Sequence, residues 1–195
     1  TGRLEEEILR LVYRAEPDQL RQRLRKLMEQ DGATLITIRD LNRENKLLGF
    51  SLFHSIRAHD YFQEFKNSNI SEYIRENAVG RVVIIAGIFI DSSTAFENLE
   101  QTVLNETLTY CLADEYHYAV YKNEIENNPA VHEILELHGF QKLPDERPYP
   151  VFLVNMNTPC TLMLKIENMM KEPFRNNARV KAAVFRTRKK LQAAL

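Results

Sequence analysis

The sequence predicts an α/β domain built around a mixed sheet. The chain has 195 residues, of which 44% are hydrophobic and 27% are charged, a composition that can bury a core without disulfides or a metal. Segments with the alternation of strands are interspersed with segments whose apolar residues recur at helical spacing. Residues 81–90, RVVIIAGIFI, are apolar almost throughout, which is typical of a central strand buried on both faces.

The N-terminal part is predicted to contain a strand, a helix and an antiparallel hairpin. Residues Ile8–Ala15 are expected to form a short strand because apolar side chains cluster there. Pro17 and Asp18 favour the start of a helix, since proline is tolerated in the first turn and the helix dipole stabilises an acid there. β-branched residues and alternation predict an antiparallel hairpin, with strands at Ala33–Arg39 and Leu47–Ile56 around a polar turn at Asn42–Lys46. Helices are expected in the polar segment that follows, Tyr61–Asn77.

The C-terminal part is predicted to alternate between helices and strands. Helices are expected at Glu97–Asp114 and Pro129–His138, the second ended by Gly139, because glycine adopts left-handed backbone easily. Strands are expected at Tyr116–Tyr121, Phe140–Leu143, Val151–Met156 and Thr161–Ile166. A basic amphipathic helix is expected at Ala178–Leu195. We therefore expect one domain over residues 1–157 and a C-terminal extension over 158–195 that leads to another domain.

The most specific stretch is 128–140, NPAVHEILELHGF. Its asparagine is placed to start a helix, its glycine to reverse the chain and its phenylalanine to begin a strand. This stretch and the order of the predicted elements resemble the GNAT superfamily of acyl-CoA N-acyltransferases over residues 9–156. The resemblance implies the GNAT fold, a mixed sheet whose central parallel strands splay apart, here with a C-terminal helical extension. It also implies acetyl-CoA as the cofactor.

The resemblance further implies where the cofactor would lie. Backbone groups of the long strand hold the pantetheine arm in this family, and a glycine-rich loop with a basic residue holds the phosphates. The residues expected to contact the cofactor are Gly87, Ile88, Phe89, Ala95, Asn98, Leu99, Glu100 and Asn128.

The phosphate loop departs from the family pattern. Ala95 replaces the basic residue, and Asn98 and Glu100 replace the two glycines, so acids lie where phosphate oxygens would sit. On the alternative interpretation, one of Ser92, Ser93 and Thr94 simply caps a helix whose acidic first turn favours its dipole.

The catalytic acid is also altered. The tyrosine with which many GNAT enzymes protonate the departing thiolate is matched by Leu135, which has no proton to give. The substitutes that we consider are Tyr116, Tyr118, His132 and His138. Either His54 or His59 is a further candidate, as a base near the substrate entrance, because histidine titrates near neutral pH. Each of these side chains also has a purely structural interpretation.

Composition limits the partners. The net charge is −1, so no field of the whole molecule would concentrate nucleic acid or an anionic membrane. Two cysteines outside any paired motif suggest a reduced, cytoplasmic protein, and no apolar run is long enough to span a bilayer. The histidines and cysteines show no metal-ligand spacing, so no metal is expected. The basic C-terminal segment is expected to meet solvent or neighbouring domains of the same polypeptide, and nothing indicates the oligomeric state.

Two functions follow from these observations. The first is an acetyl-CoA-dependent N-acyltransferase, in which the protein positions the thioester and polarises its carbonyl for attack by an amine. The second is a catalytically inactive GNAT-like sensor or interaction module of a larger protein, favoured by the residues at 95, 98, 100 and 135. Fold alone does not decide between them.

Overall fold

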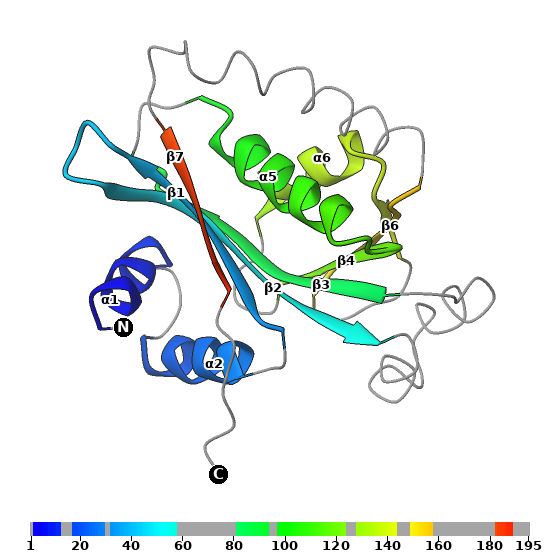
Figure 1. Ribbon diagram of the computed structural model, residues 1–195, viewed down its shortest axis with the longest axis horizontal. Coiled ribbons are helices and arrows are strands. Elements are labelled where there is room, and N and C mark those ends of the chain that lie inside the picture. The colour runs from blue at the N-terminus through cyan, green and yellow to red at the C-terminus, as the bar shows by residue number, and fades with distance from the viewer. Residues whose placement is uncertain are drawn as a thin grey trace.

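The computed structural model describes residues 2–12, 17–29, 32–57, 81–93, 97–123, 128–143, 149–157 and 182–188. Within these ranges a mixed sheet separates two layers of helices (Figure 1). The helices are α1 (Gly2–Leu11), α2 (Pro17–Glu29), α5 (Leu99–Ala113) and α6 (Pro129–Leu137). The strands are β1 (Thr34–Asp40), β2 (Lys46–Arg57), β3 (Arg81–Ile90), β4 (Tyr118–Lys122), β5 (Gln141–Lys142), β6 (Val151–Asn155) and β7 (Ala182–Arg188).

Among the described residues, the sheet has seven strands in the order β5-β6-β4-β3-β2-β1-β7. Of these strands, only β3 and β4 run parallel, and every other neighbouring pair is antiparallel. Helix α5 joins β3 to β4, which is the long crossover that a parallel pair requires. The parallel pair therefore lies at the centre of the sheet, where strands are buried on both faces.

The two faces of the sheet carry separate apolar clusters. Helices α5 and α6 cover one face, and α1 and α2 lie against the other (Figure 1). The larger cluster packs α5 and α6 residues such as Val103, Leu104 and Leu135 on Val83 and Ile85. The second cluster unites Ile8, Val12 and Leu24 from the N-terminal segment with the β1, β2 and β3 residues Leu35, Leu47, Phe50, Leu52 and Phe89.

Most sequence-based elements are confirmed. Helix α2, the β1–β2 hairpin, β3, α5, β4, α6, β5 and β6 lie within a few residues of the predicted ranges. The predicted helices of Tyr61–Asn77 and the predicted strand Thr161–Ile166 lie outside the described residues.

Two predictions are wrong. The predicted strand Ile8–Ala15 begins inside helix α1, because Leu4, Ile8 and Val12 recur every four residues and share one helix face. The predicted helix Ala178–Leu195 contains strand β7, which pairs antiparallel with β1 from Thr34↔Arg188 to Asp40↔Ala182. Without β7, the outer edge of β1 would leave its backbone N–H and C=O groups unpaired. The sequence AAVFRTR has the β-branched and aromatic residues that suit a strand at this edge.

Candidate functional site

The pairing of the two central strands ends half-way along β3. Parallel pairing runs from Val82↔Tyr118 to Ile85↔Tyr121 and stops there, while β3 continues to Ile90. On the other side of β3, Leu52 pairs with Gly87 and Phe53 with Ile85, so Ala86 is an extra residue that forms a β-bulge. A bulge of this kind bends its strand and increases the local twist. Residues 86–90 of β3 extend past the end of β4 at Lys122, and no described strand pairs with them on that side, which we call the opening.

A phenylalanine lies over the glycine of this opening. A Cβ atom on Gly87 would stand 2.3 Å from Cε2 and 2.6 Å from Cζ of Phe89, and 3.4 Å from Nδ2 of Asn123. The Phe89 ring stacks on Phe50 with 4.8 Å between ring centroids. Gly87 therefore leaves the room that the Phe89 ring fills.

Asn123 was missed by the sequence analysis. It follows β4 directly and is buried, with 3% of its surface exposed. Its Nδ2 donates a hydrogen bond to the Tyr121 hydroxyl at 3.3 Å. The one available signal was its position as a polar residue just past an apolar strand.

An ion pair connects the residue after β3 to the first residue of β2. The Lys46 ammonium lies 2.6 Å from the Asp91 carboxylate, which also accepts hydrogen bonds from the backbone and hydroxyl of Ser93. Partial burial raises the pKa of Asp91, but the hydrogen bonds from Lys46 and Ser93 outweigh burial and hold the pKa below its ordinary value. Asp91 is therefore a structural carboxylate that joins the β1–β2 turn to the end of β3.

The N-terminus of α5 keeps the backbone shape that a glycine would give it. Asn98 is the N-cap residue and is left-handed, with φ 56° and ψ 33°, and its side chain makes no capping hydrogen bond. Asparagine tolerates this conformation better than most residues. The proposed cap at Ser92 or Ser93 is wrong, because the helix starts later and Ser93 bonds to Asp91 instead. Thr94 and Ala95 lie outside the described residues.

The other residues predicted to contact the cofactor divide between core and surface. The side chains of Ile88 and Leu99 are buried in the α5–α6 cluster. Glu100 is half-buried in the first turn of α5, and Glu97 is exposed just before it. Acidic side chains thus flank the helix end at which the resemblance placed phosphates.

The stretch 128–140 has the structure that its sequence predicted. Asn128 caps α6 by accepting a hydrogen bond from the Ala130 amide at 3.1 Å. Gly139 is left-handed with φ 83°, and Phe140 is buried with its amide bonded to the Leu135 carbonyl at 3.0 Å. The Leu135 side chain is fully buried.

Comparisons with known proteins agree with this architecture. No protein-family model matches the chain, and no curated protein matches it. Among solved structures, FeeM, an N-acyl amino acid synthase from uncultured soil microbes, superimposes with a TM-score of 0.52 at 12% identity over 77% of this chain and 89% of FeeM. The chain has the GNAT fold. NAA60 of Arabidopsis thaliana, solved in complex with acetyl-CoA, is also similar, with a TM-score of 0.48 at 16% identity over 65% of this chain and 78% of NAA60.

The two tyrosines proposed as catalytic lie at the start of β4, at the opposite end of the paired segment from the GNAT opening. Arg81 holds Tyr116: its guanidinium lies 4.4 Å from the ring centroid and donates to the hydroxyl at 3.1 Å and to the Asp114 carbonyl at 2.8 Å. Burial raises the pKa of the Tyr116 hydroxyl. Tyr118 packs in a third apolar cluster with Val82 and other strand residues.

The proposed histidines lie in three different settings. His132 is half-buried on α6, its ring 4.9 Å from that of Phe152, and burial followed by the charge of Lys142 lowers its pKa. His138 caps the C-terminus of α6 and bonds through Nε2 to the side chain of Asn105 at 2.8 Å. His59 lies outside the described residues.

His54 is the candidate that lies beside the bulge. It pairs with Ile84 of β3 and, by strand alternation, faces the same side as Leu52, towards α1 and α2. Its residue surface is 6% exposed, and its Nε2 is buried without a hydrogen-bond partner. Burial lowers the pKa of His54 to about 4, so the ring is neutral at pH 7.

Within the described ranges, no cluster of histidine, cysteine, aspartate and glutamate is arranged to hold a metal ion. None of the helices seen there is long and apolar enough to cross a membrane.

Proposed function

We propose that this chain is an acyl-CoA-dependent N-acyltransferase. The observation that carries the proposal is the end of β3–β4 pairing after Ile85 and Tyr121, next to the bulge at Ala86. Beyond this point no described strand pairs with β3 on the β4 side. Backbone groups at residues 87–89 would then pair with the amides of an extended pantetheine arm, as another strand would.

The residues around the opening suit the pantetheine arm along β3, but they suit the phosphates less well at the start of α5. Gly87, Ile88 and Phe89 would hold the pantetheine arm through their backbone groups, and the first turn of α5 would face the phosphates. Asn98, the N-cap of α5, has the left-handed backbone that glycine adopts most easily. Glu97 and Glu100 oppose the phosphates by charge. When bound, the group would supply a thioester carbonyl that is open to attack by an amine.

The acceptor amine would approach from the face of the sheet that carries His54. This side chain lies beside the bulge, and its buried Nε2 lacks a partner that an acceptor group would provide. Because the ring is neutral at pH 7, it would orient the acceptor by a hydrogen bond without repelling an ammonium group. The remaining contribution of the protein is alignment of the two reactants.

A catalytically inactive binding module is the alternative, and one observation favours it. Leu135 takes the position of the family's acid and is fully buried, so it contributes only to packing. The same opening would then bind an acyl-CoA as a sensor does, and no transfer would follow.

Isothermal titration with acetyl-CoA, followed by an assay for thiol release with a panel of primary amines, tests the proposal. Binding together with amine-dependent thiol release is expected. Binding without release by any amine would support the inactive module, and no binding at millimolar concentration would refute both functions.

A charge variant tests the orientation of the cofactor. Glu100→Gln should tighten acetyl-CoA binding by about threefold, since solvent at this half-buried position weakens the repulsion. The matched control is Glu133→Gln, an exposed glutamate on α6, which should leave the affinity unchanged. Equal affinities in both variants would mean that the phosphates do not lie at α5.

A further inference from the structure

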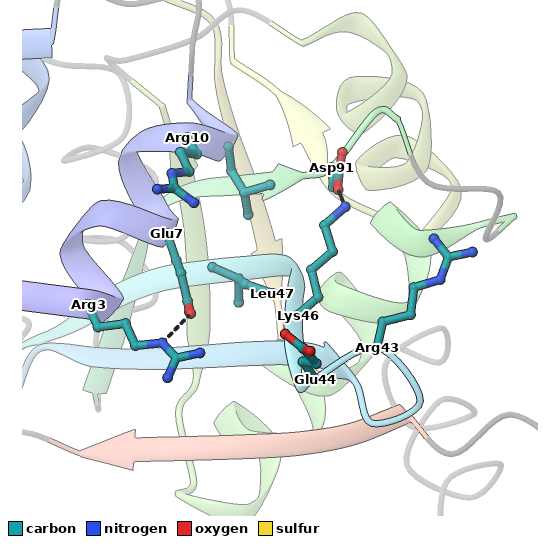
Figure 2. A pocket seen from close by; sticks show the side chains of 9 residues that line it. Arg3, Glu7, Arg10, Arg43, Glu44, Lys46, Leu47 and Asp91 are labelled. Carbon is teal, nitrogen blue, oxygen red and sulfur yellow. Dashed lines mark ion pairs between the residues drawn. The ribbon is translucent and has the colours of Figure 1, made fainter.

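A pocket of about 690 Å³ lies between α1 and the β1–β2 turn, beside the residue that follows β3 (Figure 2). Its volume falls within the range of small-molecule sites. Its described lining includes no residue of β4 or α5 and none of β3 residues 86–90, so the pocket is separate from the opening. Two leucines give it an apolar part and the other side chains are charged: Leu11, Leu47, Arg3, Glu7, Arg10, Arg43, Glu44, Lys46 and Asp91.

Most of the charges in the lining are already paired within the protein. The Lys46 ammonium lies 2.6 Å from the Asp91 carboxylate. The Glu7 carboxylate lies 2.7 Å from a guanidinium nitrogen of Arg39 and 3.4 Å from Nε of Arg3. A ligand would have to compete with these contacts, so the paired groups do not determine what the pocket binds.

One cation and one anion of the lining form no ion pair with any described residue. They are Arg10, on α1, and Glu44, in the turn, which lie on opposite walls of the pocket (Figure 2). Both residues are exposed, so water solvates their charges where no ligand is bound. A second cation, Arg43, has only a 3.7 Å contact with Asp40, and 71% of its side chain is exposed. The pocket therefore offers unpaired charge of both signs.

We propose that this pocket binds a small zwitterion, a free amino acid or a short peptide. Its carboxylate would bind Arg10 and Arg43, because guanidinium groups bind carboxylates through planar, charge-assisted hydrogen bonds. Its ammonium group would bind Glu44, and an apolar side chain would lie on Leu11 and Leu47. A simple anion would leave Glu44 unpaired beside a like charge, and a simple cation would do the same to the arginines.

Such a ligand would join α1 to the β1–β2 turn. It would bind the folded chain alone, since the two walls come together only on folding, and it would therefore stabilise the fold by mass action. The pocket would then be a ligand-sensing site that is independent of the proposed transfer reaction.

Isothermal titration of the full chain with leucine and with leucyl-leucine tests the inference. The N-acetyl form of each probe lacks the ammonium group, and the C-terminal amide form lacks the carboxylate. Each blocked form should bind about fivefold more weakly than its zwitterionic parent, as expected for one lost ion pair at an exposed site. The tighter of the two parents identifies the ligand as an amino acid or a peptide.

Charge variants assign each end of the ligand. Glu44→Gln should weaken binding of the zwitterion about fivefold and leave binding of the N-acetyl form unchanged. Arg10→Gln should weaken the zwitterion equally and leave binding of the amide form unchanged. The matched controls are Glu133→Gln on α6 and Lys26→Gln on α2, both exposed and outside the pocket lining, and they should change no affinity.

Three results would overturn the inference. The first is no binding of either parent probe at millimolar concentration. The second is a blocked form that binds as tightly as its parent, because a zwitterion would then not be required. The third is displacement of the bound zwitterion by acetyl-CoA, because the pocket would then belong to the acyl-CoA site. A failure of acetyl-CoA to bind would refute the proposed function and leave this inference standing.

Discussion

Replacing Gly87 with alanine should destabilise the protein through one identified contact. The new methyl carbon would lie 2.3 Å from Cε2 and 2.6 Å from Cζ of Phe89, whereas carbon atoms pack at roughly 3.5–4.0 Å. The ring would have to move by about 1 Å or more. The ring is buried, and its centroid lies 4.8 Å from that of Phe50, on which it stacks. Its movement would therefore crowd neighbouring core side chains and weaken the stacking on Phe50. We expect a loss of about 2–3 kcal/mol in the free energy of unfolding.

Urea denaturation of four proteins measures this contact. The set is the unaltered protein, Gly87→Ala, Phe89→Leu and the double variant. Leucine lacks the two ring atoms that clash. The loss of unfolding free energy caused by Gly87→Ala should therefore be smaller by at least about 1 kcal/mol in the Phe89→Leu background. A coupling free energy below about 0.5 kcal/mol, within the error of additive sites, would show that the Phe89 ring does not lie over Gly87.

Three further predictions concern the cap, the buried histidine and the arginine at the start of β3. Asn98→Gly should preserve or raise the melting temperature, while Asn98→Ala should cost about 1 kcal/mol because alanine is strained at positive φ; equal stabilities would contradict the left-handed cap. His54 has a pKa near 4 in the folded state and an ordinary one when unfolded, so the unfolded chain binds more protons between these values. Stability should therefore fall by about 3 kcal/mol as pH drops from roughly 6.5 to 4, and His54→Gln should flatten that part of the pH profile of denaturation. Arg81→Gln should lower the free energy of unfolding by about 1–2 kcal/mol through loss of its contacts with Tyr116 and Asp114, and a thermal melt unchanged from that of the parent would refute the clamp.

The parts of the fold that were predictable carry strong local signals. The apolar run of β3 and the cap residues Asn128 and Gly139 each determine their element through neighbouring positions. The segment from Ile8 was ambiguous, because its clustered apolar residues suit a strand as well as a helix when Leu4 is left out. Strand β7 was not predictable locally, since the partner that makes it a strand is β1, far away along the chain.

The candidate site shows the same division. The sequence reveals that Asn98 replaces a glycine, yet the backbone conformation survives because asparagine tolerates positive φ. The ion pair of Lys46 with Asp91 and the approach of Asn123 to Gly87 join segments that no periodicity relates. Long-range side-chain contacts of this kind depend on the register of the sheet, which local patterns do not specify.

The pairing of β1 with β7 has a consequence for synthesis. Residues 34–40 leave the ribosome long before residues 182–188, so the flank of β1 in the nascent sheet stays unprotected until β7 has been made. A bare strand flank of this kind can recruit other chains, and non-local pairing forms slowly. Until β7 pairs with it, the flank of β1 is therefore a site at which the nascent chain can aggregate, even if the finished sheet is stable.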